Sequence, residues 1–474
     1  MVQADIGSTD TTSIFMQSGP ALRVEGTVYA NDANSAVDAF GSIGTSVTVT
    51  ATGRIFAQSQ TGTAGIYFGS LANVDNAGTL ECRRGTAMVA DGNSTVTNTG
   101  QIVTGEAGVV LSNNGTGGAV FNSGLIRAGT SLGGNSLLQS GVVVACNDVS
   151  VINTGTIITQ KAGFAAVQVT EGNTAISGVT IDNAGTLTGP RDYGIDAGSG
   201  DSIVSGIKVL NTGLITGGIL AIRGSLGGDT VTNFGTITMR STNALSMDLN
   251  DGVDVLVNNG VINGSVALGF DADRYNGRNS TAGADINGGA GTDDITGGAF
   301  NDTLRGGADS DFLSGGAGDD ELSDFGGDTT VYGGAGDDAI GVNGGTNLQF
   351  GGAGDDNCVG ATGVDQIYGG AGDDTLTGLA GNDIYGVNTP GDVVTEGAAG
   401  GMGDRVQSGS VSLNLNLFAN VENATLTGVG ALALTGSAGA KVPTGNVAGN
   451  RIAGGWGPTG CWAVWGWMCS CSRR

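Results

Sequence analysis

The 474-residue sequence contains no histidine and only three lysines, and its 18 basic residues are outnumbered by 44 acidic ones. Without histidine, neither a Ser-His-Asp catalytic triad nor an H-E-x-x-H metalloprotease site can form. A formal net charge of −26 argues against nucleic acids and anionic membranes as partners. No apolar run approaches ~20 residues, so the sequence predicts no transmembrane insertion.

Aromatic residues and helical periodicity are also scarce. Aromatics make up 5% of the chain, whereas glycine alone contributes 92 residues. The apolar residues, 39% of the total, can fill a long, thin core of valine, isoleucine and leucine, but not the core of a conventional globule of this length. The composition therefore predicts an all-β solenoid.

Residues 288–386 consist of eleven consecutive nonapeptides that follow the template G-G-x-G-x-D-x-U-x, where U is a large apolar residue. The glycines allow a tight turn with positive φ angles and bare carbonyls, and the aspartate at position six adds a carboxylate. Ligands of this hard, all-oxygen kind suit Ca²⁺. Position eight is expected to point inward from a short strand, although Gln349 and Cys358 occupy it in two repeats.

Two nonapeptides would form one coil of a flattened parallel β-roll, which places equivalent turns eighteen residues apart along each edge. One edge carries aspartate at every turn from Asp302 to Asp374, which offers about four sites, whereas Thr329 and Asn347 interrupt the other edge and leave about two. The segments 324–332 and 342–350 are expected to keep the coil but not the metal. The aspartates predicted to bind calcium are Asp293, Asp302, Asp311, Asp320, Asp338, Asp356, Asp365, Asp374 and Asp383.

This pattern resembles the RTX (haemolysin-type) calcium-binding repeat family. The resemblance implies a calcium-binding parallel β-roll over residues 276–390, followed by an RTX-associated β segment at 391–440. It also implies type I secretion through a C-terminal signal, and hence an extracellular or cell-surface location. A flexible Gly/Asp-rich linker is the alternative, but a linker has no reason to hold a nine-residue phase with apolar residues at one position.

Residues 1–275 contain a second repeat, V-x-N-x-G-x-I/L, whose asparagines recur at intervals of 22 to 31 residues. That interval is about one coil of a parallel β-helix. In a stacked turn, the glycine would take a positive φ angle, and the asparagine amides would hydrogen-bond to the copies above and below. The pattern resembles the repeats of bacterial surface adhesins and other secreted β-helix proteins; an array of β-sandwiches is the alternative.

The character of the chain changes at residues 441–474, where all four tryptophans and three of the six cysteines lie. This tail fits neither repeat. Read out of frame, it would regain glycines and an aspartate at nonapeptide spacing. We therefore interpret it as the result of a frameshift near residues 440–455, and we expect the secretion signal to be missing from this product. A genuine aromatic C-terminal hook is the alternative.

An enzyme is the main functional alternative, because RTX repeats often accompany catalytic domains. The G-x-S-x-G match at residues 129–133 lies in a Gly/Ser-rich loop rather than a strand-to-helix turn, so we interpret it as a chance match. A polysaccharide lyase, epimerase or hydrolase would need acids and bases clustered on one face of the β-helix. The candidates for such a cluster are Asp182, Arg191, Asp192, Tyr193, Asp196 and Lys208.

Taken together, these patterns predict a non-enzymatic secreted or surface protein with an adhesion-type β-helix stalk and a roll that folds on binding calcium. Repulsion between aspartates and the entropy of glycine would keep residues 285–390 unfolded at low cytosolic calcium. Extracellular calcium, at roughly millimolar concentration, would saturate sites with dissociation constants of about 10⁻⁴–10⁻³ M and drive folding. Besides Ca²⁺, the expected partners are an extracellular polysaccharide, a cell surface or another copy of the chain.

Overall fold

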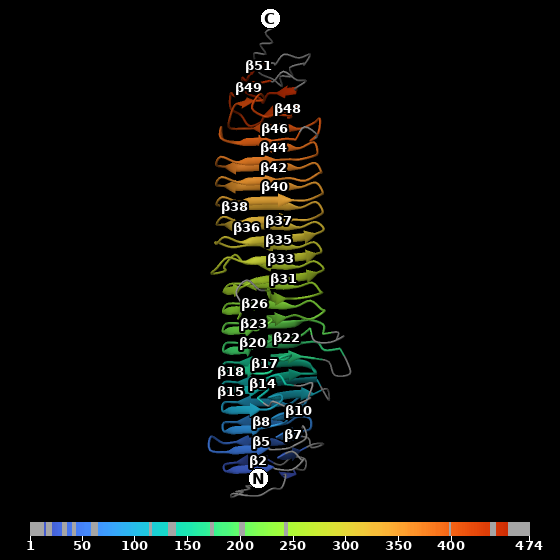
Figure 1. Ribbon diagram of the computed structural model, residues 1–474, viewed down its shortest axis with the longest axis vertical. Helices are drawn as coiled ribbons and strands as arrows, with labels where there is room; N and C mark the ends of the chain where they lie inside the picture. Colours follow the sequence, from blue (N-terminus) through green and yellow to red (C-terminus); the bar gives the residue numbers. More distant parts are fainter. Residues whose placement is uncertain are drawn as a thin grey trace. The chain divides into compact units, whose positions relative to one another are not determined.

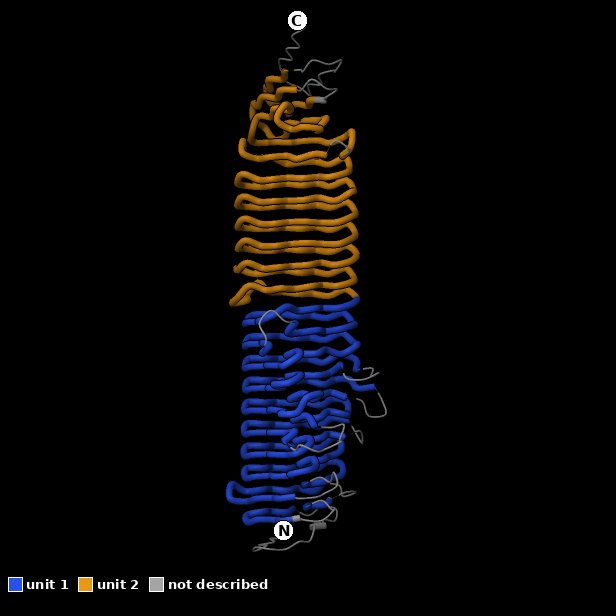
Figure 2. The backbone as a smooth tube through the Cα atoms, viewed as in Figure 1, with its two compact units in different colours: residues 1–270 blue, residues 271–474 orange. Residues whose placement is uncertain are grey.

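The computed structural model describes residues 14–15, 21–30, 36–39, 44–57, 65–112, 116–130, 139–170, 175–198, 204–240, 245–397, 400–436 and 442–453. The elements within these residues are all β-strands, which confirms the all-β prediction. No helix in the described ranges has the length and apolar character that crossing a membrane requires. The chain divides into two compact units, residues 1–270 and 271–474, which have separate colours in Figure 2.

The first unit ends at Phe270, where the sequence suggested residue 275, and the predicted segments 276–390 and 391–440 both belong to the second unit. Most of the aberrant tail, including its four tryptophans, falls in residues 454–474 and lies outside the described residues. The serine of the G-x-S-x-G match, Ser131, also lies outside them. The frameshift hypothesis therefore stays a prediction.

The first unit is a parallel β-helix with three strands in each coil. One coil contains β20 (Val179–Asn183), β21 (Thr186–Gly189) and β22 (Tyr193–Asp196). The next contains β23 (Ile207–Asn211), β24 (Leu214–Gly217) and β25 (Leu220–Arg223). Each strand pairs in parallel with its counterpart one coil away, as the stacking of β20 and β23 in Figure 1 illustrates. These pairings confirm the predicted β-helix.

A buried ladder of asparagine amides runs through the β-helix, as the repeat predicted. In each coil the Nδ2 group donates to the Oδ1 atom of the next asparagine over 2.7–2.8 Å. Asn153, for example, also donates to the carbonyl oxygens of Gly155 and Thr186. Because these amides are hydrogen-bonded to one another and to the backbone, the polar side chains can be buried at little cost. The ladder contains Asn76, Asn98, Asn122, Asn153, Asn183, Asn211, Asn233 and Asn258.

The glycine of the same motif has a different role from the one predicted. None of the motif glycines in the described part of the first unit has a positive φ angle, so that prediction was wrong. Instead, successive coils approach too closely for a side chain. A Cβ atom at Gly155, for example, would lie 2.7 Å from the carbonyl oxygen of Ser123 in the preceding coil. Glycine is needed for close approach rather than for backbone conformation.

The second unit begins as a roll with two strands in each coil, and we use "the roll" for residues 274–408. One sheet contains β33 (Asp285–Ala290), β35 (Thr303–Ala308), β37 (Glu321–Asp324), β39 (Ala339–Val342), β41 (Asn357–Val359), β43 (Thr375–Thr377) and β45 (Val393–Thr395). The other contains β32 (Arg274–Asn276), β34 (Asp294–Thr296), β36 (Phe312–Ala317), β38 (Thr330–Ala335), β40 (Leu348–Ala353), β42 (Gln366–Ala371), β44 (Ile384–Gly386) and β46 (Arg405–Ser408). Pairing is parallel, with a register of eighteen residues in the nonapeptides, as between Leu313 and Val331, and of 20 residues between β32 and β34 and 21 between β44 and β46. This is the predicted β-roll.

The side chain at position eight of all eleven nonapeptides is buried, with at most 2% of its surface exposed. Gln349 follows the rule although it is polar, and its Nε2 group donates to the carbonyl oxygen of Val359 over 3.0 Å. The coil also passes without interruption through β38 and β40, which lie in the two repeats that lack the aspartate. The coil therefore continues through repeats whose position six is not aspartate.

Candidate metal centres

Each turn on the intact edge of the roll is connected to the next through an aspartate. The backbone N–H of Asp302 donates to Oδ1 of Asp320 over 2.7 Å, and that of Asp320 donates to Asp338 over 2.9 Å. The series continues through Asp356 and Asp374 with distances of 2.9–3.0 Å. We call these five aspartates the first ladder. In each of these contacts, a backbone N–H fixes the position of one carboxylate oxygen, which belongs to the aspartate eighteen residues later in the chain.

The second ladder, on the other edge, keeps its hydrogen bonds where it lacks aspartate. The N–H of Asp311 donates to Oγ1 of Thr329 over 3.2 Å, and the N–H of Thr329 donates to Oδ1 of Asn347 over 3.0 Å. Asn347 in turn donates to Asp365, and Asp365 to Asp383. The substituted positions thus preserve the turn but not the negative charge. Unequal calcium binding by the two edges stays a prediction.

The second carboxylate oxygen, Oδ2, of the position-six aspartates indicates a cation site. In seven of the nine predicted ligands, the Oδ2 atom is buried and has no hydrogen-bond donor within the part of the chain that the structure describes. In the other two, Asp302 and Asp365, Oδ2 accepts the N–H of Gly298 and Ala361. Burying an ionised oxygen without a partner is costly. The seven residues are Asp293, Asp311, Asp320, Asp338, Asp356, Asp374 and Asp383.

Backbone carbonyls lie beside these oxygens. A Cβ atom at Gly333 would meet Oδ2 of Asp338 and would lie 2.5 Å from the carbonyl oxygen of Gly351. Gly315 faces Asp320 and the carbonyl of Gly333 in the same way. Carboxylate and carbonyl oxygens therefore border one space that only glycine leaves open. A donor set of this kind fits a hard cation such as Ca²⁺.

The electrostatics of these turns are consistent with that fit. Burial, and after it the charge of neighbouring Asp338, raise the pKa of Asp320 and that of Asp356 to about 7. Burial also raises the pKa of Asp293 to about 6 and that of Asp383 to about 7. The charged form of each carboxylate is thus disfavoured unless a cation or a proton neutralises it.

Asp324 is a carboxylate that the sequence analysis missed. It takes the place of the first glycine in the repeat with Thr329, is buried, and accepts hydrogen bonds from Gly307 N–H and Thr329 Oγ1 at 2.9 and 2.6 Å. Burial and then the contact with Asp324 raise the pKa of Asp311 to about 8. The interruption of the second ladder is therefore partly compensated by a second acid. Nothing in the nine-residue template could have indicated it, because that position is normally glycine.

Both ladders also extend beyond the predicted residues. Asp374 donates its N–H to Asp392 over 3.2 Å, and Asp383 donates to Asp404 over 2.8 Å. Asp392 and the buried Val394 hold positions six and eight of a further, worn nonapeptide, so the phase alone could have revealed them. Asp404 follows Asp383 by 21 residues rather than 18, which hides it from a count of period nine.

An outer ladder of exposed aspartates accompanies the first ladder. The N–H of Asp337 donates to Oδ1 of Asp319 over 3.0 Å, and Asp355 and Asp373 repeat the contact over 2.8 Å. These residues are the first aspartate of each GGAGDD turn, of which only the second was assigned from sequence. The intact edge of the roll therefore carries two parallel rows of carboxylates, one buried and one exposed.

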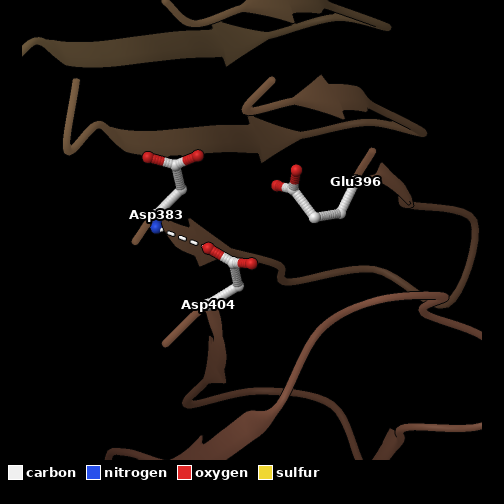
Figure 3. A group of neighbouring side chains, drawn as sticks. All are labelled: Asp383, Glu396 and Asp404. Carbon is white, nitrogen blue, oxygen red and sulfur yellow. Dashed lines mark hydrogen bonds between the residues drawn. The ribbon is translucent and has the colours of Figure 1, made fainter. Parts of the chain in front are cut away.

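Three buried carboxylates meet near the end of the nonapeptides. One oxygen from each of Asp383, Glu396 and Asp404 lies within 4.8 Å of the others. Figure 3 shows the three side chains gathered from separate segments, with the hydrogen bond from the backbone of Asp383 to Asp404. The hydroxyl of Tyr385 donates to Oε2 of Glu396. Only Asp383 was singled out from the sequence.

The structure does not bring the six candidate enzyme residues together. Asp182 on β20 and Lys208 on β23 belong to one sheet, whereas Tyr193 and Asp196 on β22 belong to another. Asp196 is buried and accepts two hydrogen bonds from Arg223 at 2.7 and 2.9 Å. Asp192, just before β22, is also buried and accepts the N–H of Gly163. Arg191 is an exposed residue beside it.

Comparison with known proteins identifies one part of the chain. A family model for the RTX calcium-binding nonapeptide repeat matches four copies, over residues 287–322 and 350–385. No curated protein and no solved structure matches the chain. The stretch between the two matches contains Thr329 and Asn347, the positions where aspartate is replaced.

Proposed function

Because residues 287–322 and 350–385 are RTX calcium-binding repeats, we propose that the chain is a secreted or cell-surface protein whose roll folds when it binds extracellular calcium. The observation that carries this proposal is the set of buried carboxylate oxygens without a donor, found in seven predicted ligands. Calcium would supply the missing partner for each pair of turns. The ligands would be the position-six aspartates and the neighbouring glycine carbonyls.

The mechanism follows from charge and chain entropy. A chain with a net charge of −26 and many glycines pays both electrostatic repulsion and conformational entropy when its turns stack. Calcium binds only the stacked turns, so binding pulls the folding equilibrium toward the roll. In a solenoid each coil contacts its neighbours, and folding can therefore propagate coil by coil. Low cytosolic calcium would leave the roll exportable, and type I secretion is the route that RTX repeats suggest.

Hydrogen exchange of the full chain, read by mass spectrometry, tests this function. With EGTA at pH 7.5, peptides from residues 285–386 are expected to exchange within seconds, and millimolar calcium is expected to protect them. Peptides from the asparagine ladder of the first unit serve as the internal control, since their protection should not depend on calcium. Equal protection of the roll with EGTA and with calcium, or full protection by magnesium alone, would contradict the proposal.

We further propose that the protein binds an extracellular polysaccharide without cleaving it. A file of four aromatic rings supports a sugar partner: Phe312, Tyr332, Phe350 and Tyr368 follow one another at centroid distances of 4.8–5.7 Å. Tyr332 and Phe312 are 39% and 38% exposed, and exposed rings of this kind commonly serve as contact surfaces.

The polysaccharide proposal is tested with alginate, pectin and related polymers in calcium. The expected result is retention of the protein on a polymer, weakened about tenfold by Phe350→Ala with Tyr368→Ala, and no change in polymer length. Tyr29→Ala is the matched control, because Tyr29 stacks on Phe56 in the first unit and does not belong to this file of four rings. Depolymerisation that Asp192→Asn or Asp196→Asn abolishes would instead establish the enzyme.

A further inference from the structure

We propose that Asp383, Glu396 and Asp404 bind a Ca²⁺ ion at a site of their own, which closes the roll after its last complete nonapeptide. Asp383 precedes β44, Glu396 follows β45, and Asp404 precedes β46, so three segments must stack before the site exists. All three side chains are buried, and one oxygen of each lies within 4.8 Å of the others (Figure 3). Glu396 and Asp404 lie outside the nonapeptides and outside the family match, which ends at residue 385.

An unpartnered oxygen points into this cluster. Asp383 is fully buried; its Oδ1 atom accepts the N–H of Asp365 over 2.8 Å, but its Oδ2 atom has no donor among the described residues. A Cβ atom at Gly378 would meet the hydroxyl of Tyr385 and that Oδ2 atom, and would lie 2.9 Å from Oε2 of Glu396. The two carboxylates therefore border the same small space. Within the described ranges, neither Asp383 nor Glu396 forms an ion pair with a basic side chain.

The donor chemistry selects calcium. The site offers carboxylate oxygens and no sulfur or nitrogen ligand, which disfavours zinc and copper. Magnesium usually keeps several of its waters, whereas this space is buried and narrow. Three carboxylates converge here, compared with the single position-six aspartate that each nonapeptide contributes. Because calcium affinity rises with the number of charged ligands, this site is expected to fill before the nonapeptide sites.

Early filling gives the site a role in folding. It would fix the neighbouring strands β44 and β46 of one sheet together with β45 of the other, and the remaining coils can propagate from there toward the N-terminal end of the roll. The role in folding rests on the proposed function, whereas the binding of Ca²⁺ at this site does not, because it requires no calcium bound to the nonapeptides.

Terbium titration of the full-length protein tests the site, since bound Tb³⁺ luminesces when a nearby tyrosine is excited. Tyr385 donates its hydroxyl to Glu396 and is the expected donor of excitation. We expect the wild-type protein to bind a first equivalent of Tb³⁺ that calcium displaces. Glu396→Gln is expected to lower the affinity for this equivalent about tenfold or more. Glutamine can still accept the tyrosine hydroxyl, so the variant should fold. Tyr385→Phe should keep the binding, measured by equilibrium dialysis, but lose most of the first-equivalent emission.

Asp356→Asn is the matched control, because it removes one nonapeptide carboxylate and should leave the first equivalent unchanged. The site is overturned if Glu396→Gln binds the first equivalent of Tb³⁺ with unchanged affinity. It is also overturned if Asp356→Asn loses the first equivalent while Glu396→Gln keeps it. If calcium protects the roll from hydrogen exchange but no first equivalent of Tb³⁺ is bound, the proposed function is supported and the site is refuted. A first equivalent without calcium-dependent protection would support the site and remove the proposed function.

Discussion

Without calcium, the roll is expected to be most stable below about pH 4 and to lose stability steadily as the pH rises to about 8. The window follows from carboxylates whose pKa burial in the roll raises from the ordinary value of 3.8 to about 6 for Asp338, about 7 for Asp320 and about 8 for Asp311. Above pH 4 the unfolded chain has released these protons and the roll still holds them. Each further rise in pH therefore favours the unfolded chain until the folded carboxylates ionise as well.

Urea unfolding of calcium-free protein at a series of pH values measures this dependence. The urea midpoint of the calcium-free roll is expected to fall as the pH rises from 4.5, until the roll is unfolded without urea at pH 7.5. In saturating calcium the direction should reverse, because protons then compete with the metal for the same oxygens. A calcium-free midpoint that rises with pH would contradict this prediction, because it would mean that the pKa values of the carboxylates are lower in the roll than in the unfolded chain.

The matched variant replaces Asp320, Asp338 and Asp356 together with asparagine. The chain itself shows that asparagine fits position six, since Asn347 accepts the N–H of Thr329 over 3.0 Å and the coil continues through it. The triple variant is expected to form the roll at pH 7.5 without calcium, and its stability should vary less with pH, because three carboxylates with raised pKa values are removed. If the variant still requires calcium to fold, the negative charge at these three turns is not what prevents the roll from folding.

The second large effect is expected in the β-helix, where Asn153→Asp should destabilise the first unit by about 3–5 kcal/mol. The Nδ2 group of Asn153 donates to Oδ1 of Asn183 over 2.8 Å and to the carbonyl oxygens of Gly155 and Thr186 over 3.3 Å. An aspartate at this position has no hydrogen to donate and would set a carboxylate against three acceptor oxygens.

Urea denaturation and hydrogen exchange of first-unit peptides, with and without calcium, measure the loss. Asn73→Asp is the control, because Asn73 is an exposed residue of β8 (Asn73–Asn76) and the same change there should cost about 0.5 kcal/mol or less. The loss in Asn153→Asp should not be recovered by calcium. Equal effects of the two substitutions would mean that the asparagine ladder does not stabilise the coils.

Much of this architecture could be predicted from the sequence because a solenoid repeats its local contacts. The nine-residue phase fixes which residue enters the core, and the structure buries position eight even where it is Gln349 or Cys358. The interval between motif asparagines likewise predicted the amide ladder, since equivalent positions in a stack must lie above one another. In both units the periodic pattern determined the fold and the register, because each coil meets only its neighbours.

Only the tertiary structure decided what happens where the period fails. Asp404 joins the second ladder 21 residues after Asp383, and Glu396 reaches the same point from the end of another strand. Asp324 places an acid where the template has glycine. The motif glycines proved necessary for close contact between coils rather than for positive φ angles. Each of these features depends on how segments of unequal length stack in space, and a periodic count carries no information about an insertion until the chain has folded around it.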